Sequence, residues 1–502
     1  MAIGAEGRSD ARGIVGDLLV LTLLVAVMLA WPLTAPPIGT HGEAREGLVV
    51  QDVGRDGRWV LPLRNGEVPS KPPLYHWIAA GIGACVGSSD AVVRIPSALA
   101  AWLVLVLVYA LGVAAGGRTS GWLAVGALAG MHTFFESASE ARVDMLFTAW
   151  ITLALAAFWR WYERDGASAR AICYAAIAAA VLTKGPAGAV LPLLVIVGFL
   201  ACERRWDRAA ALCSLRLALA AVVVVGGWYV LAAWAGGADF VHRQILKENL
   251  DRFVGRGVFG MHGGRSRLAM LENLATDLLP WNLVLPAAAF AWWRGVRTDT
   301  LGRLLHTWWI VILAFFTVAY GKRGVYLLPL YPAIAVLAGR ALGDLVSRLR
   351  ADPDGARSAP MRFLQRLAPG RPWRALIGAV VIMDLVVVLV GQSVRVRRAR
   401  RASLVPFAAT VAERVPPKAP LVADLSLDES DYLVLSYRLG RAIPRAVPGA
   451  PCTPGTFHLA TPRPGAPIVA PLLVSERRGV PVALAEDTAE TCPLALERGD
   501  DR

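Results

Sequence analysis

Long apolar segments alternate with polar ones along most of the chain. About 20 apolar residues are needed for a helix to cross the hydrocarbon core of a bilayer. The pattern therefore predicts an all-α polytopic membrane protein with about eleven spans and an outer loop at 236–279. The segments are 14–34, 93–115, 119–138, 145–162, 170–183, 187–202, 212–235, 280–293, 303–320, 325–342 and 375–392.

Two parts of the chain depart from this pattern. Residues 73–87 are apolar but too short for a full span, which favours a helix at the interface or a re-entrant one within a first outer loop at 35–92. After residue 392 the apolar runs become short, at 420–423, 432–435 and 467–474, and read as strands. We therefore expect a transmembrane domain, 1–392, and a C-terminal domain, 393–502, that is α/β or β-rich; a loosely packed tail is the alternative.

Composition supports the membrane assignment. Hydrophobic residues make up 56% of the chain and charged residues 18%, against roughly 25% charged in soluble domains. The mean hydropathy is +0.50. The net charge of +14 would suit nucleic acid, but arginines of membrane proteins gather in cytoplasmic loops, and no basic helix with interleaved aromatics occurs outside the membrane flanks. We expect no nucleic-acid partner.

The charge distribution predicts an orientation. Arg8 and Arg12 precede the first span and place the N-terminus in the cytoplasm, so the long loop after that span is outside. Arginines also follow each even-numbered span, as expected for cytoplasmic loops. Two regions disagree: the outer loop 236–279 and the run RVRRARR at 395–401. We favour anionic lipid headgroups as the partners of that run; an error of one span is the alternative.

The first outer loop is unusual because Thr40 to Trp77 is polar and far longer than a connector requires. It also carries apolar residues at helical spacing, Leu48, Val49, Val50 and Val53. We interpret it as a folded loop on the membrane surface.

Ionisable residues gather on the predicted outer side, and charges at span ends are costly enough to need a reason. Each has an ordinary alternative: Lys184 and Lys322 would snorkel, Asp144 would cap a helix, Glu43 would pair with Arg45 or Arg64, and His262 would be a surface residue. Because these residues all lie on the predicted outer side, we favour a single site that they form together. The candidates are Glu43, Arg45, Lys71, Asp144, Lys184, Glu248, Arg252, His262, Lys322, Arg323 and Tyr326.

These residue types suit group transfer from an anionic, lipid-linked donor. A carboxylate near the membrane surface can take a proton from an acceptor hydroxyl, and neighbouring cations can neutralise a phosphate leaving group. A transporter or flippase of lipid-linked sugars is the alternative, although we find no internal repeat of the kind typical of transporters. Six cysteines show no metal-type spacing; Cys452 and Cys492 would form a disulfide if their region is extracytoplasmic.

The same residues carry a resemblance. The motifs GEAREG, KPPLYHW, RVD at a span start, LTKGP and KRGVYLLPLYPA resemble, in this order over about 40–345, the GT-C membrane glycosyltransferases. The group most similar contains protein O-mannosyltransferases and the lipid A aminoarabinose transferase. The resemblance implies inverting transfer of a sugar from a polyprenyl-phosphate carrier to a lipid, glycan or protein acceptor, outside the inner membrane of a bacterium.

The resemblance also implies roles. Glu43 would be the general base and Asp144 the second acid of the catalytic pair. Lys71, Lys322 and Arg323 would bind the donor phosphate. Apart from the resemblance, we expect Arg45 to bind the phosphate as well, and we take as possible substrate contacts Lys184, Glu248, Arg252, His262 and Tyr326.

Two departures from the family pattern matter. Gly42 stands where the family often has a first acid, which leaves a non-catalytic, lipid-binding relative open. Ser70 stands where an acid often helps to hold a divalent metal, so we expect no metal and no other cofactor.

Overall fold

The computed structural model describes residues 3–251, 268–278, 281–283, 299–320, 322–352, 359–401, 403–446, 455–461, 472–477 and 480–487. The chain forms two compact units. Unit 1 comprises Met1–Leu33, Ser70–Tyr75 and Arg94–Gln392, and unit 2 comprises Thr34–Pro69, His76–Val93 and Ser393–Arg502. The predicted division into domains 1–392 and 393–502 stays a prediction. Unit 2 combines residues from both of these ranges.

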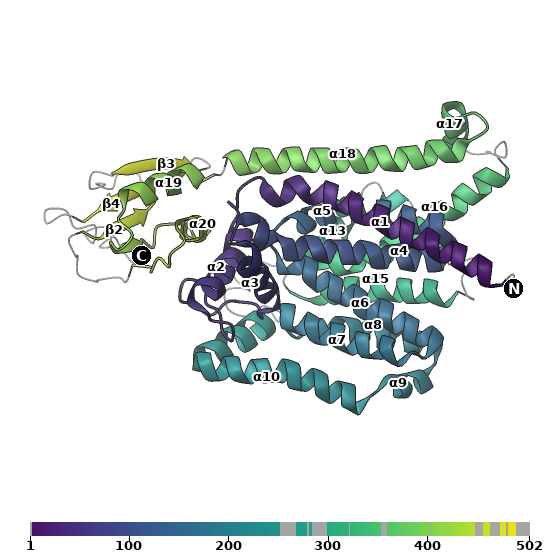
Figure 1. The fold of residues 1–502 in the computed structure, drawn as a ribbon, viewed down its shortest axis with the longest axis horizontal. Coiled ribbons are helices and arrows are strands. Elements are labelled where there is room, and N and C mark those ends of the chain that lie inside the picture. The colour runs from purple at the N-terminus through teal and green to yellow at the C-terminus, as the bar shows by residue number, and fades with distance from the viewer. Residues whose placement is uncertain are drawn as a thin grey trace. The chain divides into compact units, whose positions relative to one another are not determined.

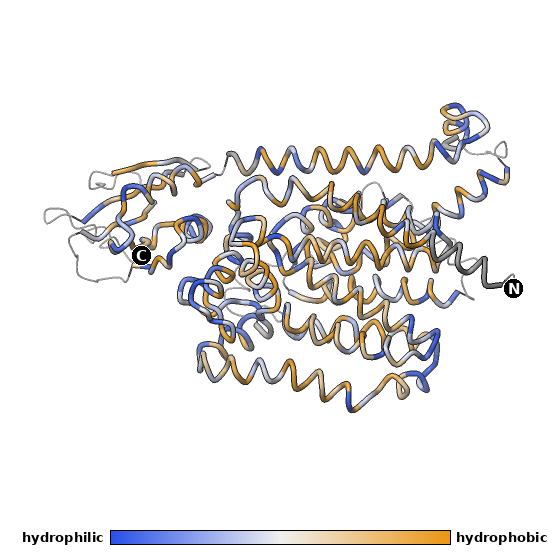
Figure 2. Tube along the Cα trace, in the orientation of Figure 1, coloured by the Kyte–Doolittle hydropathy of each residue, from blue (hydrophilic) through white to orange (hydrophobic). Residues whose placement is uncertain are grey.

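Unit 1 is a bundle of apolar helices that run side by side (Figures 1 and 2). Among the described residues, eight helices are long and apolar enough to cross a membrane, which confirms a multi-span membrane protein. The elements that lie wholly or mainly in this unit are α1 (Ile3–Thr34), α4 (Asp90–Ala129), α5 (His132–Ser139), α6 (Val143–Arg164), α7 (Ala167–Lys184), α8 (Ala187–Glu203), α9 (Trp206–Leu212), α10 (Leu215–Phe240), η1 (Val241–Asp251), α13 (Ala269–Asp277), η2 (Trp281–Leu283), α15 (Thr300–Val318), η4 (Gly324–Leu330), α16 (Tyr331–Ala351), α17 (Ala359–Leu367) and α18 (Pro372–Arg401).

The predicted apolar segments correspond to helices, with one correction. The segment expected as a single span at 119–138 is divided, because α4 ends at Ala129 and α5 starts only at His132. Within α4, Gly116 and Gly117 leave helical geometry, and Gly117 has a φ of +83° that favours glycine, so the chain turns between two helices there. The segment 280–293 lies mostly outside the described residues, and the count of eleven spans stays a prediction.

Burial identifies the centre of unit 1. In the most apolar window, 72% of the α6 residues are buried, 78% of those in the span Gly324–Ala351, which joins η4 to α16, and only 6% of those of α18. Helices α6 and α16 therefore lie inside the bundle, and α18 exposes most of its apolar surface, as a lipid-facing helix does.

Helix α16 lies very close to α4. Gly339 and Gly343 are one turn apart on α16, and a Cβ at Gly339 would lie 2.4 Å from the backbone nitrogen of Ala124. A Cβ at Gly343 would lie 2.0 Å from the hydroxyl of Ser120. This is the small-residue spacing that lets membrane helices pack backbone to backbone.

Unit 2 combines the first outer loop with the C-terminal region. Four strands form one sheet of order β1-β2-β4-β3, in which β1 and β2 are parallel and the other pairs antiparallel. This confirms a small α/β domain. The elements are α2 (His41–Asp56), α3 (Leu74–Val86, which starts in unit 1), α19 (Val405–Arg414), α20 (Glu429–Leu439), β1 (Leu421–Ala423), β2 (Phe457–Ala460), β3 (Leu473–Arg477) and β4 (Val480–Glu486).

The prediction of a strand at 432–435 is wrong, because these residues lie in α20. The side chain of Asp428 caps this helix at the amide of Ser430 and Gly440 ends it, so local capping prevails over the β-forming residues between them. The run 467–474 overlaps β3 only at its end, and its other residues lie largely outside the described ones.

Helix α2 packs on α20 within unit 2. Leu48, Val49, Val50 and Val53 are all buried, as their spacing predicts. Gly47 lies where a Cβ would be 2.5 Å from the ring of Tyr437, and Gln51 donates a hydrogen bond to the Tyr437 carbonyl. The outer loop is therefore folded, and its apolar face is covered by the C-terminal region.

Candidate active-site residues

The structure places Asp144 in an ion pair. Asp144 lies in the first turn of α6, and its Oδ1 is 2.6 Å from Nζ of Lys184, at the end of α7. The side chains are only 15% and 12% exposed. Asp144 lies where an acid favours a helix N-terminus, as its ordinary reading predicts, and it also pairs with Lys184, which the ordinary readings did not include.

Aromatic rings complete this cluster. The Lys184 ammonium lies 4.8 Å from the ring centre of Phe147 and 5.1 Å from that of Tyr326 in η4. Cation–π attraction adds to the ion pair when the cation is poorly hydrated. The structure thus brings together three of the predicted residues, Asp144, Lys184 and Tyr326, from three elements of unit 1.

Lys71 forms a second charged pair in unit 1. Its Nζ lies 3.5 Å from Oε2 of Glu248 in η1, and both side chains are 11% exposed. The two prolines after Lys71 keep the backbone extended before α3 begins at Leu74. A cation and a carboxylate are thus held together with little exposure.

Lys322 and Arg323 take different positions. The Lys322 ammonium donates to the carbonyls of Thr317 and Ala319 at the end of α15, at 2.6 and 3.0 Å. A cation there is favoured by the helix dipole. Arg323 is exposed and precedes η4. Arg252 and His262 lie outside the described residues.

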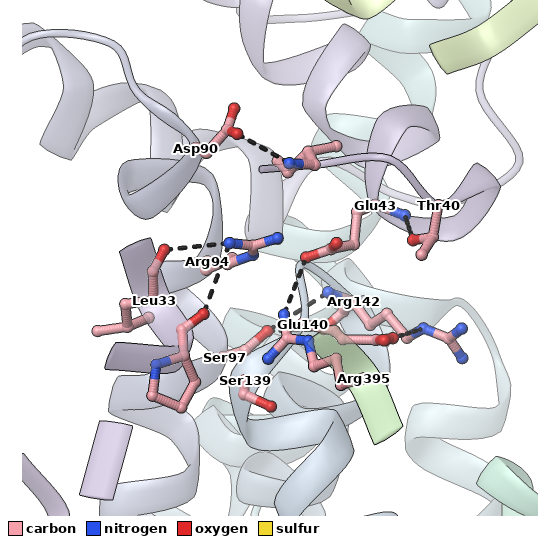
Figure 3. Close-up of polar contacts among 12 residues, drawn as sticks. Leu33, Thr40, Glu43, Asp90, Arg94, Ser97, Ser139, Glu140, Arg142 and Arg395 are labelled. Atoms are coloured by element: carbon pink, nitrogen blue, oxygen red, sulfur yellow. Dashed lines mark hydrogen bonds and ion pairs between the residues drawn. The ribbon is translucent and has the colours of Figure 1, made fainter. Parts of the chain in front are cut away.

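Glu43 lies in the first turn of helix α2 in unit 2. Thr40 is the N-cap, and its hydroxyl accepts a hydrogen bond from the Glu43 amide. The Glu43 carboxylate is 3% exposed and lies 3.8 Å from Nη2 of Arg395 (Figure 3). Arg395 is therefore a partner of Glu43 that sequence reasoning did not consider.

Arg45 belongs to a different cluster of unit 2. Its guanidinium makes two hydrogen bonds to Glu46, whose other oxygen lies 2.8 Å from Nε2 of His76. Burial raises the pKa of Glu46, but the charge of Arg45 and the bond to His76 outweigh this and hold that pKa well below its usual value. Arg45 thus has a structural partner already.

Sequence reasoning missed several charged residues with buried contacts. Arg94 is fully buried and donates to the carbonyls of Leu33 and Pro32, and Arg142 pairs with Glu140 at 2.8 Å (Figure 3). The signal for Arg94 was present, because an arginine in the first turns of an apolar span needs a partner. Arg395 was assigned only to a lipid-facing run.

The described residues contain no group of three His, Cys, Asp or Glu side chains that could hold a metal. The metal-free expectation stays a prediction.

Comparisons with known proteins match this chain to membrane glycosyltransferases. A family model described as dolichyl-phosphate-mannose-protein mannosyltransferase matches residues 70–229. An undecaprenyl phosphate-alpha-4-amino-4-deoxy-L-arabinose arabinosyl transferase of Pseudomonas aeruginosa is 32% identical over 330 residues, 62% of this chain and 58% of the relative. One from Pseudomonas fluorescens is 29% identical, over 65% of this chain and 57% of the relative. The chain spans less than two thirds of these relatives.

Solved structures show the same fold over nearly the whole chain. ArnT from Cupriavidus metallidurans, solved bound to undecaprenyl phosphate, aligns with a TM-score of 0.76 and 18% identity, over 97% of this chain and 99% of ArnT. The archaeal oligosaccharyltransferase AglB from Archaeoglobus fulgidus aligns with a TM-score of 0.56 and 12% identity, over 87% of this chain and 65% of AglB. These findings confirm the resemblance found in the motifs: the chain is similar in sequence to the protein mannosyltransferases and the aminoarabinose transferases over the matched residues, and it has the fold of ArnT.

Proposed function

We propose that the protein transfers a sugar from a polyprenyl-phosphate donor to an acceptor hydroxyl on the outer, periplasmic face of a bacterial inner membrane. The observation that carries the proposal is the poorly exposed charged pair Lys71–Glu248, at a motif of the family and in a fold shared with a protein solved with undecaprenyl phosphate. The acceptor would be a lipid, a glycan or a protein.

The proposed reaction is a single displacement. The acceptor oxygen attacks the anomeric carbon while its proton passes to the Glu43 carboxylate, and the bond from that carbon to the phosphate oxygen breaks. The sugar inverts, and the carrier phosphate leaves with the electron pair. Arg395 would hold the Glu43 carboxylate in place through the ion pair at 3.8 Å.

Lys71 is the proposed phosphate ligand, and Glu248 would occupy it in the absence of donor. The donor phosphodiester carries one negative charge, as a carboxylate does, and the carrier phosphate gains further charge as it leaves, so the ammonium would move from Glu248 to the phosphate oxygens during transfer. Lys322, Arg323 and Arg45 are the further proposed phosphate ligands. Because the contacts of Lys322 and Arg45 are structural, their substitution would lower stability as well as donor affinity.

Asp144 would orient the sugar or the acceptor, with Lys184 and Tyr326 beside it. Glu248, Arg252 and His262 are the remaining proposed substrate contacts.

The test is transfer of radiolabelled sugar from a polyprenyl-phosphate donor mixture to envelope acceptors by membranes containing wild type, Glu43→Gln or Glu413→Gln. Glu413 is an exposed acid of unit 2 and serves as the matched control. We expect label with wild type and E413Q, and a loss of at least about a hundredfold with E43Q. Full transfer by a folded E43Q protein would refute the role of Glu43. Movement of labelled lipid across vesicles without sugar transfer would favour a flippase instead.

A further inference from the structure

A groove lies in unit 1 between α4, α6 and α7, at the end of α6 opposite to Asp144. It has a volume of about 320 Å³, within the roughly 300–1,000 Å³ range of ligand sites. Asp144 and Arg160 are 16 positions apart on α6, or about 24 Å along a helix. The groove is therefore separate from the Asp144–Lys184 cluster.

Small side chains form the walls of the groove. Ala110 and Ala114 are exposed and one turn apart on α4, and Ala156 and Ala157 face the groove from α6. Leu107, Leu153 and Ile172 add larger apolar surface. The groove is thus an apolar channel in the side of a membrane bundle, of the kind that an acyl chain fills.

Charged side chains lie at one end of the groove. Arg160, Glu163 and Arg164 belong to the last two turns of α6, and Ser168 to the first turn of α7. Within the described part of the chain, neither Arg160 nor Arg164 has a hydrogen bond or an ion pair. Two arginines four positions apart on a helix repel each other, and the single charge of Glu163 offsets this only in part, so an anion between them would reduce the remaining repulsion.

We propose that this groove binds an anionic phospholipid. Its phosphate diester would lie between the Arg160 and Arg164 guanidinium groups, which suit phosphate oxygens, and one acyl chain would lie along the alanines of α4 and α6. Glu163 leaves the polar end with a net charge of +1, which favours an anionic lipid over a zwitterionic one. Basic pockets between spanning helices on the cytoplasmic side bind such headgroups, and the arginine distribution places this end there.

The test is lipid retention by the purified full-length protein, measured by native mass spectrometry during titration with phosphatidylglycerol or phosphatidylcholine of the same chains. We expect wild type to retain phosphatidylglycerol at least tenfold more strongly. Equal retention of the two lipids would overturn the proposal. So would loss of bound undecaprenyl phosphate on substitution of Arg160 and Arg164, which would make the groove a carrier site.

Two variants test separately how the lipid headgroup and the acyl chain contribute to binding. Arg160→Gln with Arg164→Gln should remove the preference for phosphatidylglycerol, and Ala114→Leu should reduce retention of both lipids by filling the groove. The matched controls are Arg216→Gln and Ala220→Leu, at exposed positions of the spanning helix α10 outside the groove. If both groove variants remain monodisperse and behave as their controls do, the proposal is wrong.

Discussion

At the scale of single residues, the Asp144–Lys184 pair allows a structural role to be separated from a catalytic one. Removing one member of a poorly exposed ion pair leaves an uncompensated charge, which costs about 3 kcal/mol. We expect Asp144→Asn and Lys184→Met each to lower the thermal stability of the protein in detergent. The double variant should be more stable than the sum of the two effects predicts.

Sugar transfer by the same three variants completes this prediction. If Asp144 orients substrate, the double variant regains stability but not activity. Recovery of both together would show that Asp144 serves only to pair with Lys184.

The ionisation of Glu46 makes the stability of unit 2 depend on pH. Its pKa is lower in the folded protein than its ordinary value of 4.5, so its contribution to stability is present above about pH 4.5 and decreases as the pH falls. Burial raises the pKa of Asp52, which acts in the opposite direction. We therefore compare variants: between pH 7 and pH 4, wild type should lose more thermal stability than Glu46→Gln. An equal loss in both would contradict the assignment.

At the scale of elements, the α4–α16 contact should tolerate no added volume. Gly339→Ala places a methyl group 2.4 Å from the Ala124 backbone, and relief requires the helices to separate. Overpacking of this kind costs about 1–3 kcal/mol, visible as a lower melting temperature in detergent. Gly226→Ala is the control, because a Cβ there meets nothing within 4 Å. A melting temperature of G339A equal to that of G226A would contradict the close packing.

The helices of unit 1 were predictable because apolar length alone marks a helix that crosses a bilayer. Helix α2 was predictable from the spacing of Leu48, Val49 and Val53. The pairing of Glu43 with Arg395 was not, because nothing local relates positions 352 residues apart. Helix α20 was predicted as a strand because the prediction rested on its β-forming residues and did not consider the capping residues on either side of them.

The candidate site, like the fold, was predictable from the sequence only in part. Motif order identified Asp144, Lys184 and Tyr326, which the structure brings together. It could not show that Arg45 is already paired with Glu46, because a partner one position away is set by side-chain rotamers that a sequence pattern does not record.

At the scale of the whole molecule, the proposed chemistry needs no metal, since lysine and arginine would neutralise the phosphate. We expect sugar transfer by membranes to be unchanged, within about twofold, after treatment with a chelator and after addition of Mg²⁺, Mn²⁺ or Zn²⁺. A loss of activity that one metal restores would show that the protein uses a divalent ion.

The interleaving of unit 2 has a consequence for biosynthesis. Gln51 and Tyr437 contact each other although they are 386 positions apart in the chain. At a translation rate of about 5–20 residues per second, the covering helix emerges about 20–80 s after α2. During that interval the apolar face of the new loop stays uncovered. A chain whose synthesis stops after the last span would therefore have its helices inserted in the membrane, but the apolar face of α2 would stay exposed. We expect envelope proteases to degrade such a chain.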